Sequence, residues 1–522
     1  MGRGYTDEQR AVIEAGPRLR RGDNMAVRAF AGAGKTTTLL GLAPVMRGRG
    51  VYLTFNKSNA DEARVKFRGT RCRPSTFHSL GWSVVGERGV SPHMAGAPDL
   101  KRSGIMNRFV MPRIHGWGDY RFASAAARTM RHFCNSDAEE VNESHARMAL
   151  VDSLGEPEMI ADEQRRAKVE QIIEQLTPDL VAIAGLYFRS LVDDGKMSHD
   201  VYLKMMDLNE SVRRQAFAGF DYALVDEGQD SNPVQMAILR KTGLTTVYVG
   251  DGYQQIYSWR GAVNALDQVS GPVLHLTESF RFGEDIAAQA RRVLEARPDG
   301  GPEQRLKGAG NGLVAPGRTP SIAVLCRSNM GVLHEATRLA DRGKPFSIDN
   351  AGDLLELVAS AEALYAGDVA KVRHQEISVF DSWEDLCAEA DLGGGPVSRV
   401  RDIIESDRSS RVTEVIMSGR DAKSCPTAVM TAHRAKGMEF PAVRLGEDFQ
   451  NNDIAAMRER WFSSEEESPA RHAVAREAFN VLYVAVTRAE AMLSGLDRMF
   501  ASMEDPEPET PDAPEGDGPG RS

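Results

Sequence analysis

The segment AFAGAGKTTT, residues 29–38, combines glycines, a lysine and threonines in a spacing suited to binding phosphate. It follows a short apolar run and opens a helical pattern. Gly32 and Gly34 let backbone N–H groups turn toward phosphate oxygens at the positive end of the following helix. Lys35 would then reach the β- and γ-phosphates, and the Thr36 hydroxyl would bind Mg²⁺. These residues predict a P-loop that binds a nucleoside triphosphate with Mg²⁺.

Two acids follow another apolar run, in FDYALVDEGQD. A P-loop needs an acidic partner at the end of a neighbouring strand, and the run Tyr222–Val225 ends directly before Asp226 and Glu227. Asp226 is expected to hold Mg²⁺ through its water shell, and Glu227 to orient and deprotonate the attacking water. The two clusters together predict hydrolysis of the terminal phosphate of ATP.

The pattern around these clusters predicts an α/β fold, because short β-rich runs alternate with helical patterns. One set of apolar runs predicts buried strands at Met25–Phe30, Val51–Phe55, Tyr222–Val225 and Thr246–Val249. A second set predicts strands at Val273–Leu276, Ser321–Leu325 and Thr427–Met430. Residues 100–215 carry helical periodicity instead, and the Gly- and Pro-rich stretch 300–320 predicts a loop or linker.

The composition is typical of a globular protein: 522 residues, 42% hydrophobic and 26% charged, enough for about three or four domains. No apolar run reaches the roughly 18 residues of a membrane helix, and Met1–Arg10 is too polar for a signal peptide. The five cysteines are scattered without a C-x-x-C pair, which argues against a disulfide framework or a zinc site. We therefore expect a cytoplasmic protein without a targeting segment or a membrane partner.

The charge is unevenly distributed along the chain. The net charge is −10, but residues 504–522 carry seven acids against Arg521 alone, whereas residues 1–73 hold fifteen Lys and Arg against six acids. Local basic surface attracts phosphates more than whole-chain charge does, so charge alone does not decide whether nucleic acid is a partner. The Pro- and acid-rich segment 503–522 has no apolar period and is predicted to be a disordered tail.

Further motifs follow in order along nearly the whole chain, and together they resemble those of superfamily 1 helicases of the UvrD/Rep class. Besides the two clusters above, they are YTDEQRAVI, VYLTFNKSNADEA, STFHSLG, VGDGYQQIYSWRGA, LTESFRF, VLCRSN, TAHRAKGMEF and NVLYVAVTRAE. The spellings YLTFNKS, SFRFG and NVLYVAVTRA are most similar to the F-box DNA helicase branch of that class. Ala29 stands where the strict P-loop has Gly, Gly228 and Met438 replace the usual Ala and Leu, and TFNKS stands where relatives often have TFTNK. None of these departures removes a charge or a catalytic group.

The resemblance implies an ATP site shared by two RecA-like cores, with Mg²⁺ as the metal. Arg281 and Arg488 match the two arginine-finger positions, which supply the extra positive charge that phosphoryl transfer needs. Gln254 matches the residue that reports the state of the γ-phosphate, and Gln9 is expected to read the adenine edge. The other residues expected to contact the nucleotide are Phe280 on adenine, Glu439 at the ribose, and Ala29, Ala33, Thr37 and Gly437.

The resemblance also implies a DNA-binding surface. Tyr257 and Trp259 flank Ser258 in a short loop and are expected to stack on bases, a sequence-tolerant contact that suits a tracking motor. His433 lies in the pattern T-x-H-x-x-K-G, where it would link DNA to the ATP site. The other residues expected at DNA are Phe55, Asn56, Thr76, His78 and Thr431.

The spacing of the motifs predicts two insertions. The stretch between Lys35 and Asp226 is too long for one RecA-like layer, and a second long stretch separates Cys326 from Thr431. The predicted fold class is therefore α/β, with two RecA-like P-loop cores that contain parallel sheets and each carry a largely helical insertion. The expected bounds are 1–90 and 216–268 for the first core, 91–215 for its insertion, 269–355 and 425–500 for the second core, 356–424 for its insertion, and 503–522 for the tail.

The predicted function is an ATP-dependent DNA helicase or translocase on single-stranded DNA, with 3′→5′ movement implied by the resemblance. The expected partners are single-stranded and tailed duplex DNA and other replication or recombination proteins, in a bacterial-type or phage-encoded context. The spelling QQIYSWRGA argues against the RecD-like branch of opposite polarity, and no nuclease domain is expected after the last motif. Two alternatives stay open: a translocase that removes bound proteins with little unwinding, and an ATP-binding switch with weak turnover. RNA and hybrid substrates stay open as well.

Overall fold

The computed structural model describes residues 4–54, 57–87, 102–112, 117–160, 162–195, 198–256, 264–312, 320–374, 376–378, 380, 382–393, 396–420, 425–450, 454–462 and 469–501. Four residues predicted to contact DNA, Phe55, Asn56, Tyr257 and Trp259, lie outside the described residues, as does the predicted tail 503–522.

The first sheet surrounds the predicted P-loop. In the described part of the chain it has six parallel strands in the order β3-β2-β4-β5-β1-β6. Strands β2, β4 and β5 are buried along their whole length, as expected for a parallel sheet covered on both faces. The strands are β1 (Asn24–Ala29), β2 (Gly50–Leu53), β3 (Cys72–Ser75), β4 (Tyr222–Val225), β5 (Thr245–Gly250) and β6 (Val273–Leu276). The accompanying helices are α1 (Asp7–Ala15), α2 (Lys35–Leu42), α3 (Lys57–Lys66) and α11 (Pro233–Thr242).

One strand assignment made from the sequence is wrong. The run Val273–Leu276 is predicted in the second core, but as β6 it pairs in parallel with β1 of the first sheet. The backbone N–H of Ala26 also donates to the carbonyl of Pro272 (3.0 Å). An apolar run identifies a strand but carries no information about which sheet the strand joins. The first sheet therefore extends past the predicted boundary at 268 to Leu276.

The second sheet forms the other core. Among the described residues it has five parallel strands in the order β10-β11-β9-β12-β13, and a separate short pair joins β7 (Glu278–Ser279) to β8 (Lys307–Gly308). Along β9, Ala323 and Leu325 pack toward α12 and α21, whereas Val324 and Cys326 pack toward α13 and α17, because side chains of a strand alternate between faces. The strands are β9 (Ile322–Cys326), β10 (Ser347–Ile348), β11 (Thr427–Thr431), β12 (Phe440–Leu445) and β13 (Ala489–Ser494). The helices are α12 (Glu284–Glu295), α13 (Asn329–Asp341), α18 (Ala432–Ala435), α19 (Glu447–Gln450), α20 (Ile454–Phe462), α21 (Pro469–Val486) and α22 (Asp497–Phe500).

The stretch between β3 and β4 is helical, as the periodicity of residues 100–215 predicts. Its apolar core is continuous with one face of the first sheet, since Phe122 and Leu150 belong to the same cluster as Val51 and Val225. This insertion is therefore anchored to the sheet by shared packing. Its helices are α4 (Phe77–Glu87), α5 (Arg102–Met106), α6 (Asp119–Asn135), α7 (Glu143–Leu154), α8 (Glu163–Asp193), α9 (His199–Leu208) and α10 (Glu210–Ala216).

The second insertion has a small apolar core of its own. That cluster includes Leu364, Phe380, Leu386 and Ile404, apart from the clusters of the second sheet. Its helices are α14 (Ala351–Tyr365), α15 (Trp383–Gly393), α16 (Pro396–Glu405) and α17 (Ser409–Arg420), of which α14 and α17 also pack on the sheet.

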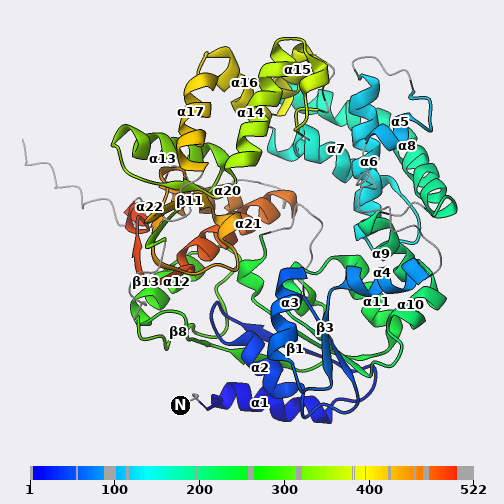
Figure 1. Cartoon of the computed structure of the whole chain (residues 1–522), viewed down its shortest axis with the longest axis vertical. Coiled ribbons are helices and arrows are strands. Elements are labelled where there is room, and N and C mark those ends of the chain that lie inside the picture. Colours follow the sequence, from blue (N-terminus) through cyan, green and yellow to red (C-terminus); the bar gives the residue numbers. More distant parts are fainter. Residues whose placement is uncertain are drawn as a thin grey trace, which may run out of the picture.

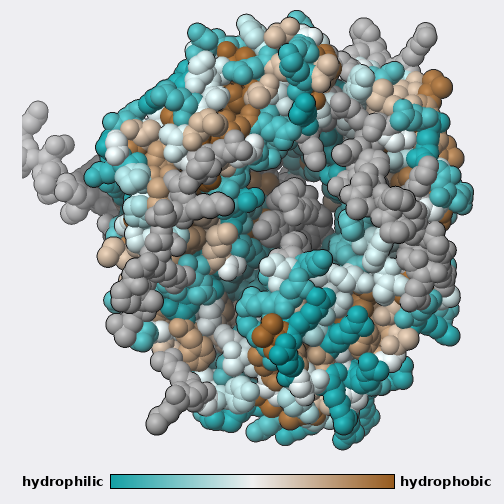
Figure 2. All heavy atoms as spheres, in the orientation of Figure 1, coloured by the Kyte–Doolittle hydropathy of each residue, from teal (hydrophilic) through white to brown (hydrophobic). Residues whose placement is uncertain are grey.

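The two insertions meet at the end of the molecule opposite α1 and α2 (Figure 1). There Arg121 of α6 forms an ion pair with Glu389 of α15, and both side chains are about nine-tenths buried. Figure 2 shows the surface hollowed near its centre, between the insertions and the two cores. In the ranges that the structure describes, no helix combines the length and the apolar character needed to cross a bilayer.

Candidate nucleotide and nucleic-acid site

The P-loop connects β1 to α2 and brings two glycines against the second half of the chain. Both Gly32 (φ 72°) and Gly34 (φ 76°) adopt the left-handed conformation that favours glycine. A Cβ on Gly32 would lie 2.6 Å from Oγ of Ser279, so this approach also requires a glycine. The backbone N–H of Phe280 donates to the carbonyl of Gly32 (2.9 Å). The phosphate-binding turn therefore lies directly against the strand that leads to Arg281.

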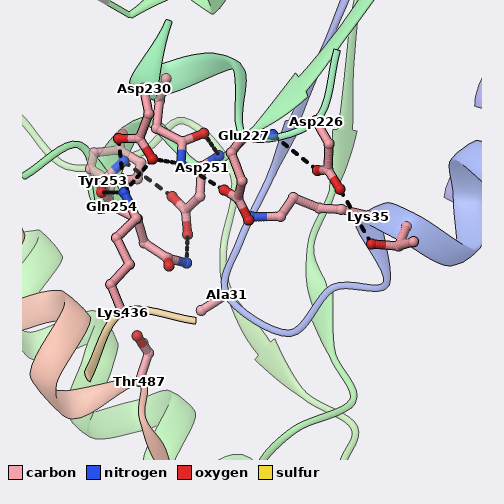
Figure 3. Close-up of polar contacts among 12 residues, drawn as sticks. Ala31, Lys35, Asp226, Glu227, Asp230, Asp251, Tyr253, Gln254, Lys436 and Thr487 are labelled. Atoms are coloured by element: carbon pink, nitrogen blue, oxygen red, sulfur yellow. Dashed lines mark hydrogen bonds and ion pairs between the residues drawn. The ribbon is translucent and has the colours of Figure 1, made fainter. Parts of the chain in front are cut away.

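The predicted acids lie where α2 begins. Because β4 and β1 are parallel strands of one sheet, their carboxyl ends meet at the same edge, where ligands bind in such folds. Nζ of Lys35 lies 2.9 Å from Oε2 of Glu227, and the Thr36 hydroxyl donates to Oδ2 of Asp226 (3.4 Å). Figure 3 shows Lys35 extended between Asp226 and Glu227. The hydroxyl and carboxylate oxygens are hard donors of the kind that Mg²⁺ prefers, so the residues present fit that metal.

The backbone at Glu227 is strained, since this non-glycine residue has φ 55°. Such a conformation costs on the order of 1–3 kcal/mol and persists where the surroundings enforce it. Burial opposes the charge of Glu227, but Lys35 and then Lys436, with a hydrogen bond from Gln229 (2.7 Å), outweigh burial and lower the pKa of the Glu227 carboxyl. Burial and the adjacent Glu227 instead raise the pKa of Asp226. Glu227 therefore loses its proton more readily than Asp226 and is ionised at neutral pH, as a residue that orients and deprotonates water must be.

The second core contributes Arg488, which is almost fully buried at 1% exposure. Within the described part of the chain its hydrogen bonds go to neutral acceptors, Oε1 of Gln254 (3.0 Å) and the carbonyls of Val484 (3.0 Å) and Met438 (3.3 Å) among them. Burial, then repulsion from Arg281, lowers the pKa of Arg488 to about 9. A buried cation bonded to neutral groups and facing a second cation is a site prepared for an anion.

Arg281 lies next to it on the segment that follows β7. Its Nε lies 2.7 Å from Oε1 of Glu439, and its Nη1 donates to the carbonyl of Thr487 (2.8 Å). The structure therefore brings the two predicted arginine fingers together, and it places Glu439 on Arg281. The buried hydroxyl of Ser279 beside them has no hydrogen-bond partner among the described residues. This also fits a ligand at the boundary between the two cores, which we call the seam and which includes Lys35, Asp226, Glu227, Arg281 and Arg488.

Polar contacts lock the loop after β5 to the second core. Nζ of Lys436 bonds both carboxylate oxygens of Asp230 (2.5 and 2.8 Å) and the carbonyl of Gln254 (2.6 Å). The side chain of Gln254 donates to Asp251 (2.7 Å), which also accepts from the hydroxyl of Tyr483 (3.2 Å). Figure 3 shows Lys436 reaching from the second core into this cluster of first-core acids and amides. Gln254 thus contacts both cores at once.

The residues predicted at adenine lie beside the P-loop. A Cβ on Gly34 would be 2.8 Å from Nε2 of Gln9 and 3.6 Å from the ring of Phe280, so both side chains border this glycine. Gln9 forms a capping box with Thr6 at the start of α1, and only 4% of it is exposed. Of the other predicted nucleotide contacts, Ala29 and Ala33 are buried, Thr37 is exposed on α2, and Gly437 has φ 85° in the turn after α18.

The predicted DNA residues that the structure describes have local structural contacts. Thr76 and Thr431 follow or end strands of the two sheets and cap the next helices, accepting from Ser79 N (3.0 Å) and Arg434 N (3.4 Å). The His78 ring packs edge-on against His199 (5.9 Å between centroids), and burial, then His199, lowers its pKa to about 4. His433 lies on α18.

Several residues of the seam are missed by the sequence predictions. Gln229 and Asp230 lie within DEGQD, and Lys436 lies within TAHRAKG, so the same motifs contain the signal. Asp251 and Tyr483 also lie within quoted motifs, VGDGYQQIYSWRGA and NVLYVAVTRAE, but the hydrogen bond between them joins residues that are distant in the chain. Chain neighbours of recognised motif residues are therefore the first candidates in such a search.

Two RecA-like α/β cores, with a P-loop and acid pair on one and the buried Arg488 beside Arg281 on the other, define a nucleotide-binding protein of the two-core P-loop class. A family model described as the UvrD/REP helicase N-terminal domain matches residues 6–268, and the chain belongs to this family.

The chain is similar over 94% of its length to two curated relatives. It is 28% identical to F-box DNA helicase 1 of Gallus gallus over 516 residues, which is 48% of that protein. It is 26% identical to F-box DNA helicase protein 1 of Schizosaccharomyces pombe over 530 residues, which is 57% of that protein. A probable DNA helicase II homolog of Mycoplasma capricolum is 32% identical over 94 residues, 17% of this chain and 13% of that protein. The chain thus spans about half the length of the first two relatives.

Proposed function

We propose that this protein is an ATP-dependent DNA helicase or translocase that moves 3′→5′ on single-stranded DNA. The main support for the proposal is the arrangement of charged groups at the seam between the cores. Lys35, Thr36 and Asp226 on one side face Arg488, a buried cation bonded to neutral groups, on the other. The two long relatives are named as DNA helicases, which supports DNA as the partner.

ATP with Mg²⁺ supplies the phosphoryl group whose transfer to water drives the motor, and the chain supplies binding, orientation and charge. Lys35 leaves Glu227 to bind phosphate oxygens, which frees the Glu227 carboxylate to orient water and accept its proton. Thr36 and Asp226 hold the metal. Arg281 and Arg488 neutralise the charge that develops on the phosphoryl oxygens.

Movement follows from the same contacts. Arg488 gains an anionic partner only when a γ-phosphate is present, so the closed arrangement of the cores is favoured with ATP and loses that contact after hydrolysis. Gln254 bonds Arg488 and Asp251, and its carbonyl bonds Lys436, so it transmits this change between cores. Single-stranded DNA would lie across Thr76, His78, Thr431 and His433, with the other predicted contacts at Phe55, Asn56, Tyr257 and Trp259.

Strand separation on tailed duplexes tests the proposal. We expect the wild type with ATP and Mg²⁺ to unwind a duplex with a 3′ single-stranded tail and to leave one with a 5′ tail paired. Lys35→Ala serves as the blank, because it removes the group that binds phosphate. Equal unwinding by Lys35→Ala, or unwinding of the 5′-tailed duplex alone, would contradict the proposal. Hydrolysis with protein displacement but without unwinding would favour the translocase form.

A further inference from the structure

Tyr52 lies on β2, between β3 and β4 of the first sheet, with only 2% of its surface exposed. Its ring packs against Phe67 at 4.5 Å between centroids. Its hydroxyl donates a hydrogen bond to Oδ2 of Asp226, the predicted metal ligand. Neither the sequence motifs nor the proposed roles of the seam residues account for this contact.

The Asp226 carboxylate is held at both oxygens. Oδ1 accepts from the backbone N–H of Glu227 (3.0 Å), and Oδ2 accepts from Tyr52 and from the Thr36 hydroxyl (3.4 Å). The backbone of Asp226 is fixed as well, because its N–H donates to the carbonyl of Leu53 (3.0 Å). Both the main chain and the side chain of Asp226 are therefore attached to β2.

We propose that Tyr52 is a positioning residue for the metal site, holding the Asp226 carboxylate in the orientation that accepts Mg²⁺. This inference rests on the proposed function, since it concerns the metal that ATP brings. Groups that hold a metal ligand in place typically contribute about 10- to 100-fold to metal affinity. Phe55 and Asn56, which are predicted to contact DNA, follow β2 closely in the sequence, since the strand ends at Leu53.

Tyr52→Phe removes the hydroxyl and keeps the ring that packs on Phe67. The matched control is Tyr222→Phe on the neighbouring strand β4. Tyr222 is equally buried at 1% exposure, but its hydroxyl donates to the carbonyl of Ala43 (3.0 Å), away from the predicted metal ligands. Both variants lose one buried hydroxyl, so any general effect on the sheet appears in both.

The experiment is a Mg²⁺ titration of the affinity for a fluorescent, non-hydrolysable ATP analogue, which needs no turnover. For Tyr52→Phe we expect the Mg²⁺ concentration at half-maximal effect to rise about tenfold or more, with the metal-free affinity unchanged. For Tyr222→Phe we expect the wild-type titration. A wild-type titration for Tyr52→Phe, or an equal loss of metal-free affinity, would overturn the inference.

A double variant separates positioning from general packing. If Tyr52 acts through Asp226, then Tyr52→Phe adds no further shift in an Asp226→Asn background, whereas independent effects would add. Additive shifts would overturn the inference even if Tyr52→Phe alone were unstable. If the nucleotide affinity of the wild type did not depend on Mg²⁺, the proposed function itself would be contradicted. That outcome differs from one in which the wild type depends on Mg²⁺ and Tyr52→Phe has no effect on this dependence.

Discussion

The nucleotide seam and the predicted DNA face use polar side chains in opposite ways. At the seam, groups far apart in the chain are buried together and bonded across the two cores, as Lys436 is to Asp230 and Arg488 to Gln254. At the DNA face, Thr76 and Thr431 bond within their own turns as helix caps. The seam is therefore preorganised for chemistry before any ligand arrives, whereas the described polar groups predicted at DNA mainly stabilise the turns in which they lie.

The seam itself is asymmetric. The first core compensates its charges internally, because Lys35 pairs with Glu227. The second core holds Arg488 among neutral acceptors beside Arg281. We infer from this difference that nucleotide binding would depend mainly on the first core and sensing of the γ-phosphate on the second.

The largest effect is expected from Arg488→Met, which keeps the bulk of the side chain and removes its charge. An arginine that stabilises the phosphoryl-transfer transition state contributes about 10³- to 10⁵-fold, so kcat for ATP hydrolysis should fall at least about 1,000-fold. ADP affinity and thermal stability should stay at or above wild type, because a buried charge without an acidic partner is removed. Arg292→Met is the control, since Arg292 pairs with Asp497 near the surface. Equal turnover in the two variants would refute the division of roles.

Glu227→Gln should come next, because it keeps the length of the side chain and removes the base. We expect turnover to fall about 100- to 10,000-fold. Nucleotide binding should persist or tighten, since Lys35 loses its ionic partner and is released for phosphate. Single-turnover hydrolysis together with equilibrium binding checks both parts. Loss of binding with unchanged single-turnover rate would show that Glu227 supports the site's structure only.

Trp259→Ala should weaken binding of single-stranded DNA without changing the nucleotide site. Base stacking typically contributes about 1–3 kcal/mol per base, so the single-strand affinity should weaken about 5- to 150-fold. Basal hydrolysis without DNA should stay at the wild-type rate, because the seam is unchanged. Fluorescence anisotropy with a labelled oligonucleotide measures the first quantity. A parallel loss of basal hydrolysis would place Trp259 in the seam instead.

The smallest effect concerns pH and His78. Burial lowers the pKa of His78 from its ordinary value of about 6.5 to about 4. Between these two pH values the imidazole is protonated in the unfolded chain and neutral in the folded chain. The stability from neutral His78 is therefore present above about pH 6.5 and is lost as the pH falls toward 4. Between pH 7.5 and 5, wild type should lose about 1–2 kcal/mol more free energy of unfolding than His78→Phe. Urea titrations at the two pH values check this, and parallel losses would contradict it.

The sequence predicts the local parts of this molecule well. The P-loop glycines, Lys35 and the acid pair form contiguous patterns whose spacing dictates the strand, turn and helix that the structure shows. The pairing of β6 with β1 cannot be predicted in this way, because an apolar run predicts a strand without indicating which sheet it joins. The contacts of Tyr52 and Tyr483 cannot be predicted for a similar reason. A tyrosine in an apolar stretch is expected to pack in the core, and the sequence does not show which distant carboxylate its hydroxyl bonds.

A helicase or translocase must couple ATP hydrolysis at the seam to binding of single-stranded DNA. The most direct test of this coupling is the rate of ATP hydrolysis by the wild type with and without single-stranded DNA, with Lys35→Ala as the blank. We expect strong stimulation by DNA in the wild type and no turnover in Lys35→Ala under either condition. A wild type that folds and binds ATP but hydrolyses it at the same rate with and without DNA would contradict the account and favour an ATP-binding switch.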